Sequence, residues 1–273
     1  MPAPDAYSSE QLSKRIGTPR APIIVDVRDA ADHLADPRLL PGAEWLGDGD
    51  AVAHLRGRNG GPVAVVCQGG LKRAQGIAAL LRAEGVAAQY LEGGFEGWRA
   101  AGLPLLDPAE LPARDATGRT RWVTRNRPKI DRIACAWLIR RFADPRAVFL
   151  FVAASEVRAV AALTGAAPFD VDGVRFTHQG DLCSFDAMIA DFGLSSPALE
   201  AVARIVRGAD TARPDLAPEA AGLLAIALGM SRLYSDDLEQ MEAGLGVYDA
   251  LYRWARDAQG ETHDWPAGQG RVV

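Results

Sequence analysis

Cys67 begins a segment whose residue types could form a nucleophilic site. The apolar run from Pro62 to Cys67 predicts a buried strand, and the apolar spacing from Ala74 to Glu84 predicts a helix. The loop between them contains two glycines and two cations, in the order Cys67, Gln68, Gly69, Gly70, Leu71, Lys72 and Arg73. The N–H groups of such a loop, together with the amino end of the next helix, stabilise a thiolate, the form of cysteine that attacks sulfur. We therefore predict Cys67 as the catalytic residue and the rest of the loop as the binding site for an anionic substrate.

Four motifs occur in a fixed order over residues 26–104. They are Asp26-Val27-Arg28, Pro41-Gly42-Ala43, the segment from Cys67 to Lys72, and Gly93-Gly94-Phe95-Glu96-Gly97-Trp98 followed by Gly102-Leu103-Pro104. Together they resemble the rhodanese family of sulfurtransferases. The resemblance implies that Cys67 carries a persulfide during turnover and that the loop amides bind its outer sulfur. We expect Asp26 and Arg28 to form a buried ion pair at the end of the sheet.

Two positions of the loop depart from the rhodanese pattern. Lys72 stands where many members have Arg, and Arg73 stands where Ser or Thr is common. The segment also reads as a cysteine with an arginine six residues later. This is the signature of cysteine phosphatases and some arsenate reductases, in which the arginine clamps an oxyanion. The helix after the loop aligns with the rhodanese helix without an insertion, which favours sulfur transfer over this alternative.

A second group of reactive side chains lies near the start of a helix predicted over residues 129–142. Asp131 and Cys135 are four residues apart and share a face of that helix. We predict an acceptor site here, and its candidate residues are Arg125, Lys129, Asp131, Arg132, Cys135 and, from later in the sequence, Asp210. One hypothesis is that Cys135 receives sulfur from Cys67. The alternative is a solvated basic face around a half-buried cysteine.

A histidine and two acids are close together in the sequence of the second half. His178, Asp181 and Asp186 are candidate metal ligands, because imidazole and carboxylate groups bind divalent ions. Their spacing matches no closed zinc site, so a hydrogen-bonded histidine–aspartate pair without metal is the alternative. Sulfur transfer at Cys67 is expected to need no cofactor.

Further segments of the second half also occur in order. They are residues 131–142, 168–170, 176–178, 206–210 and 218–224. They resemble the C-terminal domain of the ChrB chromate-resistance proteins. The resemblance implies a role in chromate or oxidative-stress resistance but supplies no mechanism. A chromate-responsive regulator that binds DNA is an alternative function. The net charge of −5 and the lack of a recognisable helix-turn-helix weigh against it.

The order of the predicted elements is typical of an α/β protein with two domains. We predict a rhodanese-like parallel-sheet domain over residues 1–107, a proline-rich linker over 108–120, a mixed α/β and mainly helical domain over 121–259, and a flexible tail over 260–273. In the first domain, strands are expected at 22–27, 62–67 and 86–91. In the second, strands are expected at 122–124, 147–152 and 174–178, and helices at 129–142, 156–163, 184–192, 197–208, 217–232 and 236–257. Ser184 and Asp236 are the predicted helix caps.

The composition narrows the class of protein further. The chain has 273 residues and three widely separated cysteines, a poor disulfide framework that suits a reducing compartment. No apolar run reaches membrane length, and the amino terminus does not resemble a signal peptide. We therefore expect a cytoplasmic sulfurtransferase whose partners are a small anionic sulfur donor and a thiol acceptor, with no membrane partner. Nucleic acid is disfavoured as a partner. The oligomeric state stays open.

Overall fold

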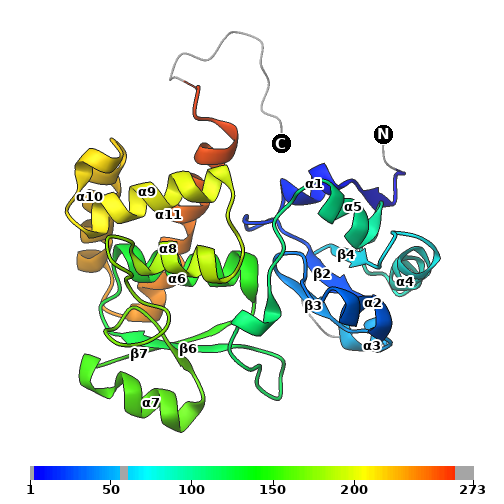
Figure 1. Ribbon diagram of the computed structural model, residues 1–273, viewed down its shortest axis with the longest axis horizontal. Helices are drawn as coiled ribbons and strands as arrows, with labels where there is room; N and C mark the ends of the chain where they lie inside the picture. Colours follow the sequence, from blue (N-terminus) through cyan, green and yellow to red (C-terminus); the bar gives the residue numbers. More distant parts are fainter. Residues whose placement is uncertain (1–2, 56–60, 262–273) are drawn as a thin grey trace.

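The strands of the protein form two separate sheets (Figure 1). The computed structural model describes residues 3–55 and 61–261. The first sheet has the strand order β1-β5-β4-β2-β3 and the second has the order β7-β6-β8. All of these strand pairings are parallel. The predicted α/β class is therefore confirmed, with a parallel-sheet first half and a mainly helical second half.

The first sheet alternates with short helices along the chain. Its elements are β1 (Ala6–Tyr7), α1 (Ser9–Ser13), β2 (Ile23–Asp26), α2 (Ala30–Ala35), β3 (Ala43–Trp45), α3 (Ala51–Leu55), β4 (Val63–Val66), α4 (Lys72–Ala83), β5 (Ala88–Leu91) and α5 (Gly94–Ala100). Alternate residues of the central strand β4 face opposite sides of the sheet. Val65 packs in the same cluster as Ala78 of α4, whereas Val66 packs in the cluster that contains Phe95 of α5. Helices on both faces bury the strand that leads to Cys67.

The second sheet has three strands and a larger set of helices. Its elements are β6 (Arg121–Arg125), α6 (Ile130–Leu138), β7 (Val148–Val152), α7 (Val157–Thr164), β8 (Ala167–Pro168), α8 (Ser184–Asp191), α9 (Pro197–Asp210), α10 (Ala220–Leu233) and α11 (Asp237–Asp257). Helix α6 continues as a π-helix over Ile139–Ala143, and short 3₁₀ turns occur at Pro108–Glu110, Ala154–Glu156 and Pro214–Leu216. Val123 of β6 packs against Val157 of α7, and Trp122 packs against Phe192, which follows α8. The sheet therefore has α7 on one face and α8 on the other, as Figure 1 shows.

Two sequence predictions in this half are wrong. Residues 174–178 do not form a strand, because Phe176 makes only an isolated bridge to Phe169. The third strand is β8, which was not predicted. It is only two residues long, and one of the two is a proline, which has no backbone N–H to donate a hydrogen bond to a neighbouring strand. Ser184 is the first residue of α8 and not its cap, which is Cys183. Asp236 caps α11 as predicted.

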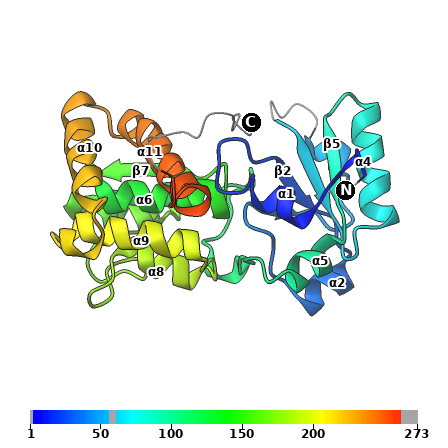
Figure 2. The ribbon, with the colours of Figure 1, turned by 90° about the horizontal axis from the view of Figure 1, so that it is seen from above.

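The two halves share one hydrophobic core. Ile16 and Leu40 of the first half belong to the same buried cluster as Phe142 and Tyr252 of the second. A Cβ atom on Gly17 would lie 2.5 Å from Phe142 and 2.6 Å from Tyr252, so the two halves touch closely there. The guanidinium of Arg256 also donates to the backbone carbonyls of Ser13, Lys14 and Ile16. The second half therefore docks on the first as a packed interface (Figure 2).

The segment over 108–120 connects the halves and is itself held in place. The carboxylate of Asp115 accepts hydrogen bonds from Thr117, Arg119 and Arg121, and Arg114 lies 3.3 Å from Asp144. The predicted tail lies outside the described residues from position 262 onward. No helix in the described ranges is both long and apolar enough to cross a membrane.

Candidate functional site

Cys67 directly follows the last residue of β4, the middle strand of the first sheet. It is 5% exposed, at the carboxyl end of a strand that lies between β5 and β2. In open parallel sheets, ligands bind in the crevice outside the carboxyl ends of the strands. The thiol therefore lies at the edge of the sheet where chemistry is expected.

The loop after Cys67 has backbone N–H groups without a hydrogen-bond acceptor among the described residues. Within residues 3–55 and 61–261, the backbone N–H groups of residues 69–73 donate no hydrogen bond. Gly70 has a φ of +67°, a left-handed conformation that favours glycine, and Lys72 is exposed at the first turn of α4. Unsatisfied N–H groups in a loop and at a helix start attract an anion. The loop can therefore bind a negatively charged sulfur beside Cys67.

The start of α5 supports this loop from the neighbouring strand end. The N–H of Phe95 donates to the carbonyl of Cys67 at 2.9 Å, and the N–H of Glu96 donates to the carbonyl of Gln68 at 3.0 Å. The side-chain amide of Gln68 also donates to Glu96 at 3.2 Å. These bonds turn the carbonyls of the loop toward α5, and they fix the position of Cys67.

Arg73 has partners outside the loop. Its Nη2 atom donates to the carbonyl of Gly47 at 2.9 Å and to Oδ1 of Asp48 at 2.7 Å. An arginine that clamps an oxyanion must direct its guanidinium fork toward the nucleophile. Here the end of the fork binds the chain segment that follows β3.

Asp26 and Arg28 form the predicted buried ion pair. The two side chains are fully buried and 2.7 Å apart. The guanidinium of Arg28 also donates to the carbonyls of Asp36 and Arg38 and lies over the ring of Phe95. The pair thus ties α2 and α5 to the sheet, which is a structural role.

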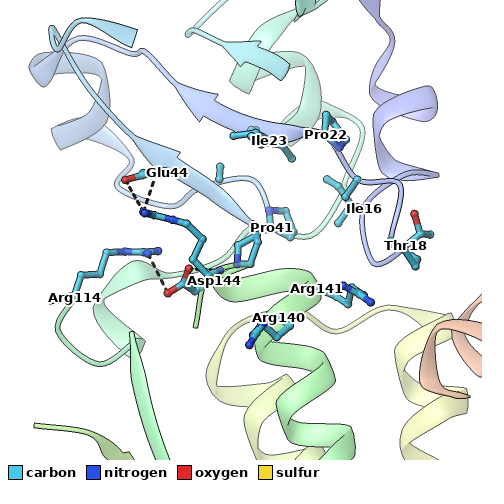
Figure 3. A pocket seen from close by; sticks show the side chains of 17 residues that line it. Ile16, Thr18, Pro22, Ile23, Pro41, Glu44, Arg114, Arg140, Arg141 and Asp144 are labelled. Carbon is cyan, nitrogen blue, oxygen red and sulfur yellow. Dashed lines mark hydrogen bonds and ion pairs between the residues drawn. The ribbon is translucent and has the colours of Figure 1, made fainter. Parts of the chain in front are cut away.

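A cavity of about 460 Å³ lies between the two halves (Figure 3). It is lined by Ile23 and Ile24 at the start of β2 and by four arginines of the second half and the connecting segment: Arg114, Arg140, Arg141 and Arg146. Each arginine is ion-paired, with Asp144, Glu242, Asp249 and Glu44 respectively. Because Ile23 begins β2 whereas Cys67 follows the end of the adjacent β4, this cavity lies at the opposite end of the strands from the thiol.

The second domain brings several of its predicted site residues together. Nε2 of His178 lies 3.4 Å from Asp131, 3.5 Å from Asp210 and 3.6 Å from a residue absent from the predicted set, Asp170. Arg132 donates to Asp170 at 2.6 Å, and Arg125 lies 3.7 Å from the same carboxylate. Asp170 was missed because it follows β8, the strand that left no pattern in the sequence.

The remaining candidates of the second domain lie elsewhere. Lys129 and Asp181 are exposed. Asp186 accepts hydrogen bonds from Arg207 and from the N–H of Cys183, and it is not part of the group around His178. Cys135 is fully buried, and burial raises the pKa of its thiol far above the ordinary value. The hypothesis that Cys135 accepts sulfur is therefore not supported, because no donor can reach it and its thiolate is disfavoured.

Two family models match the chain, one in each half. The rhodanese-like domain model matches residues 8–101, and the ChrB C-terminal domain model matches residues 122–255. The chain joins a rhodanese-like domain to a ChrB C-terminal domain. Protein ChrB of Cupriavidus metallidurans is 39% identical over 155 residues, which are 56% of this chain and 44% of that protein. The chain therefore spans less than half the length of this relative.

Solved structures resemble parts of the chain. The thiosulfate sulfurtransferase from Pseudomonas aeruginosa is 27% identical with a TM-score of 0.32, covering 39% of this chain and 20% of that one. The protein SSP1007 from Staphylococcus saprophyticus is 24% identical with a TM-score of 0.30, covering 34% of this chain and 92% of that one. Both scores are low, and the family assignment rests on the two family models.

Proposed function

We propose that this protein is a rhodanese-type sulfurtransferase that forms a persulfide on Cys67. The observation that carries the proposal is the position of Cys67 at the end of β4, before a loop whose N–H groups at residues 69–73 donate to no described residue. These groups would hold the outer sulfur of a persulfide, which is anionic at neutral pH. The rhodanese-like family match over residues 8–101 supports the same chemistry.

The reaction has two displacement steps at sulfur. The thiolate of Cys67 attacks the sulfane sulfur of thiosulfate, a new S–S bond forms, and sulfite leaves with the electron pair of the bond that breaks. An acceptor such as cyanide then attacks the outer sulfur, and the Cys67 thiolate leaves with the electron pair of the persulfide bond. The low exposure of Cys67, 5%, favours a small donor over a folded protein.

The contacts of Arg73 favour sulfur transfer over oxyanion chemistry. In a cysteine phosphatase, the arginine six residues after the cysteine has to bind the oxyanion at the thiolate. Arg73 instead donates to Gly47 and Asp48. The anion at Cys67 is left to the loop amides, and Lys72, exposed at the start of α4, supplies long-range attraction for a negatively charged donor.

The acceptor is expected to approach from solvent. The residues of the second domain that line the cavity contact the sheet where β2 begins. They do not cover the opposite edge of the sheet, where Cys67 lies. Cys135 and Cys183 are both fully buried, which leaves neither as a sulfur acceptor. A small external thiol therefore fits the acceptor role better than a relay within the chain.

The second domain supports a role in chromate or oxidative-stress resistance. This rests on the ChrB C-terminal family match over residues 122–255 and on the 39% identity to Protein ChrB. The three cysteines of the chain are all free thiols, which favours a reducing compartment such as the cytoplasm. In this proposal the first domain performs the sulfur chemistry and the second belongs to the stress response.

Mass analysis of the intact protein after thiosulfate treatment tests the proposal. We expect an adduct of one sulfur, about 32 Da, that maps to Cys67 and is absent in Cys67→Ser. Turnover of thiosulfate and cyanide to thiocyanate should be lost in the same variant. Cys135→Ala is the matched control, because it removes a buried thiol and should retain both the adduct and turnover.

A different reactivity would overturn the proposal. Hydrolysis of a phosphate ester or reduction of arsenate by the wild-type protein, without formation of thiocyanate, would assign Cys67 to oxyanion chemistry. A sulfur adduct on Cys135 or Cys183 alone would also contradict it.

A further inference from the structure

Three carboxylates and one imidazole converge in the second domain, and we call them the Asp–His cluster: Asp131, Asp170, His178 and Asp210. They come from four separate segments, namely the first turn of α6, the residues after β8, the loop before α8 and the end of α9. Nε2 of His178 lies 3.4 Å from Oδ2 of Asp131, 3.5 Å from Oδ2 of Asp210 and 3.6 Å from Oδ1 of Asp170. One nitrogen therefore faces three oxygens at nearly equal distances.

These distances suit ligands of one metal ion better than direct hydrogen bonds. An N–H···O hydrogen bond spans about 2.7–3.2 Å, so all three contacts are longer than that range. Two ligands that each lie about 2.1 Å from a tetrahedral ion are separated by roughly 3.4 Å. The separations of 3.4–3.6 Å match this value. Ligand atoms of Asp131, Asp170 and His178 also lie within 4.8 Å of one another.

The two buried carboxylates are fixed by a shared neighbour, Ser184. Asp131 is 2% exposed, and its oxygens accept from the N–H groups of Ser184 at 2.8 Å and Phe185 at 2.9 Å. Asp170 is 4% exposed, and its Oδ1 accepts from the hydroxyl of Ser184 at 2.9 Å. Its other oxygen accepts from Nε of Arg132. Hydrogen bonds of this kind orient metal ligands in proteins and hold them before the ion binds.

The negative charge in the cluster exceeds what its neighbours balance directly. Of the three carboxylates, Arg132 and Arg125 contact that of Asp170, at 2.6 Å and 3.7 Å, whereas Asp210 has His178 as its ionic partner in the described chain. A cation between these carboxylates would relieve their repulsion.

Thr124 is a buried polar residue on the face of the second sheet that carries α8. Its side chain is fully buried, and its hydroxyl has no hydrogen-bond partner in the described structure. Because side chains alternate along β6, Thr124 shares a face with Trp122, which packs against Phe192 after α8. This is the face that carries α8, whose first residues bind Asp131. Buried hydroxyl groups without a partner are rare in folded proteins.

We propose that the Asp–His cluster binds one divalent transition-metal ion, of which Zn²⁺ and Mn²⁺ are the best-fitting examples. The imidazole ligand favours these ions over Mg²⁺ and Ca²⁺, which prefer oxygen ligands alone. The ligands would be Nε2 of His178 and one oxygen each from Asp131 and Asp170, with the carboxylate of Asp210 beside them at 3.5 Å from the same Nε2. The side chain of His178 is 41% exposed and that of Asp210 is 25% exposed, so water can reach the ion from one side.

Metal binding to the full-length chain tests this site. Protein without an affinity tag is stripped with a chelator and titrated with Zn²⁺ and with Mn²⁺ by calorimetry, and metal content is counted by elemental mass spectrometry. We expect one ion per chain for at least one of the two metals. His178→Ala should weaken binding by at least ~10-fold because it removes a direct ligand, and Asp210→Asn should weaken it because it removes a negative charge beside the ion. Both side chains are partly exposed, so neither change opens a cavity in the core.

Two controls locate the ion. Asp181→Asn changes an exposed acid three residues from His178 and should leave the affinity unchanged. Cys67→Ser removes the thiol of the sulfur-transfer loop and should also keep the bound ion, which separates this site from the proposed catalytic one. Failure of the wild-type protein to take up either metal would overturn the proposal. Wild-type affinity in both His178→Ala and Asp210→Asn would overturn it as well, and circular dichroism establishes that the variants are folded.

Discussion

Gly94 closes the Cys67 loop from the side of α5, and we predict that Gly94→Ala disrupts this loop. Gly94 has a φ of +58°, which an L side chain rarely adopts. A Cβ atom at this position would lie 2.2 Å from the carbonyl oxygen of Cys67, 2.3 Å from the nitrogen of Gly70 and 2.7 Å from the carbonyl oxygen of Gln68. All three neighbours are backbone atoms, so no side-chain rotation can relieve the contact.

The expected cost follows from two effects. The left-handed conformation costs an alanine about 1–2 kcal/mol relative to glycine. Forcing an extra carbon into a packed site costs about 1–3 kcal/mol more. Together they lower the free energy of unfolding by about 2–5 kcal/mol. The same displacement moves the carbonyls of Cys67 and Gln68 away from the N–H groups of Phe95 and Glu96 that hold them.

Urea unfolding and thiosulfate–cyanide turnover measure the two consequences. Gly94→Ala should unfold at a lower urea concentration and lose most of its turnover. Gly76→Ala is the matched control, because Gly76 lies in the exposed middle of α4, where an added Cβ atom would have no neighbour within 4 Å. It should stabilise the protein by about 0.5–1 kcal/mol. If Gly94→Ala has the urea midpoint and the turnover of the wild type, the reasoning about this contact is wrong.

Three further predictions concern the packing of the chain. Arg28→Ala should lower the free energy of unfolding by about 3–5 kcal/mol in a urea titration, because it leaves the carboxylate of Asp26 buried without its partner. A decrease in this free energy of less than about 1 kcal/mol would mean that water reaches the ion pair. Gly17→Ala should lower the midpoint temperature of thermal unfolding, because its new Cβ atom would lie 2.5 Å from Phe142 across the domain interface. An unchanged midpoint in calorimetry would show that the side chains of this interface can move apart to make room for it. Iodoacetamide should modify Cys135 and Cys183 only after denaturation, because burial removes both thiols from solvent and raises the pKa of each. Peptide mass mapping that finds either cysteine labelled in the folded protein would contradict the structure.

Features that depend on neighbouring residues could be predicted from the amino-acid sequence alone. The strand that ends at Cys67 was recognised because an apolar run of this length is typical of a strand covered on both faces. The Cys67 loop and the Asp26–Arg28 pair could be predicted for the same reason, since each lies within a few consecutive residues. A short segment carries its own pattern, and its local geometry changes little with the rest of the fold.

Contacts between side chains that are distant in the sequence became visible only in the folded chain. The Asp–His cluster joins residues from position 131 to position 210, and one member follows a two-residue strand that left no signal in the sequence. The pairing of Arg73 with Asp48 and the burial of Cys135 also depend on elements that are far apart along the chain. The physical reason is that the packing of helices and sheets sets which side chains face each other. A hydrophobic pattern in the sequence predicts which face of an element is buried, but it does not indicate which other element packs against that face.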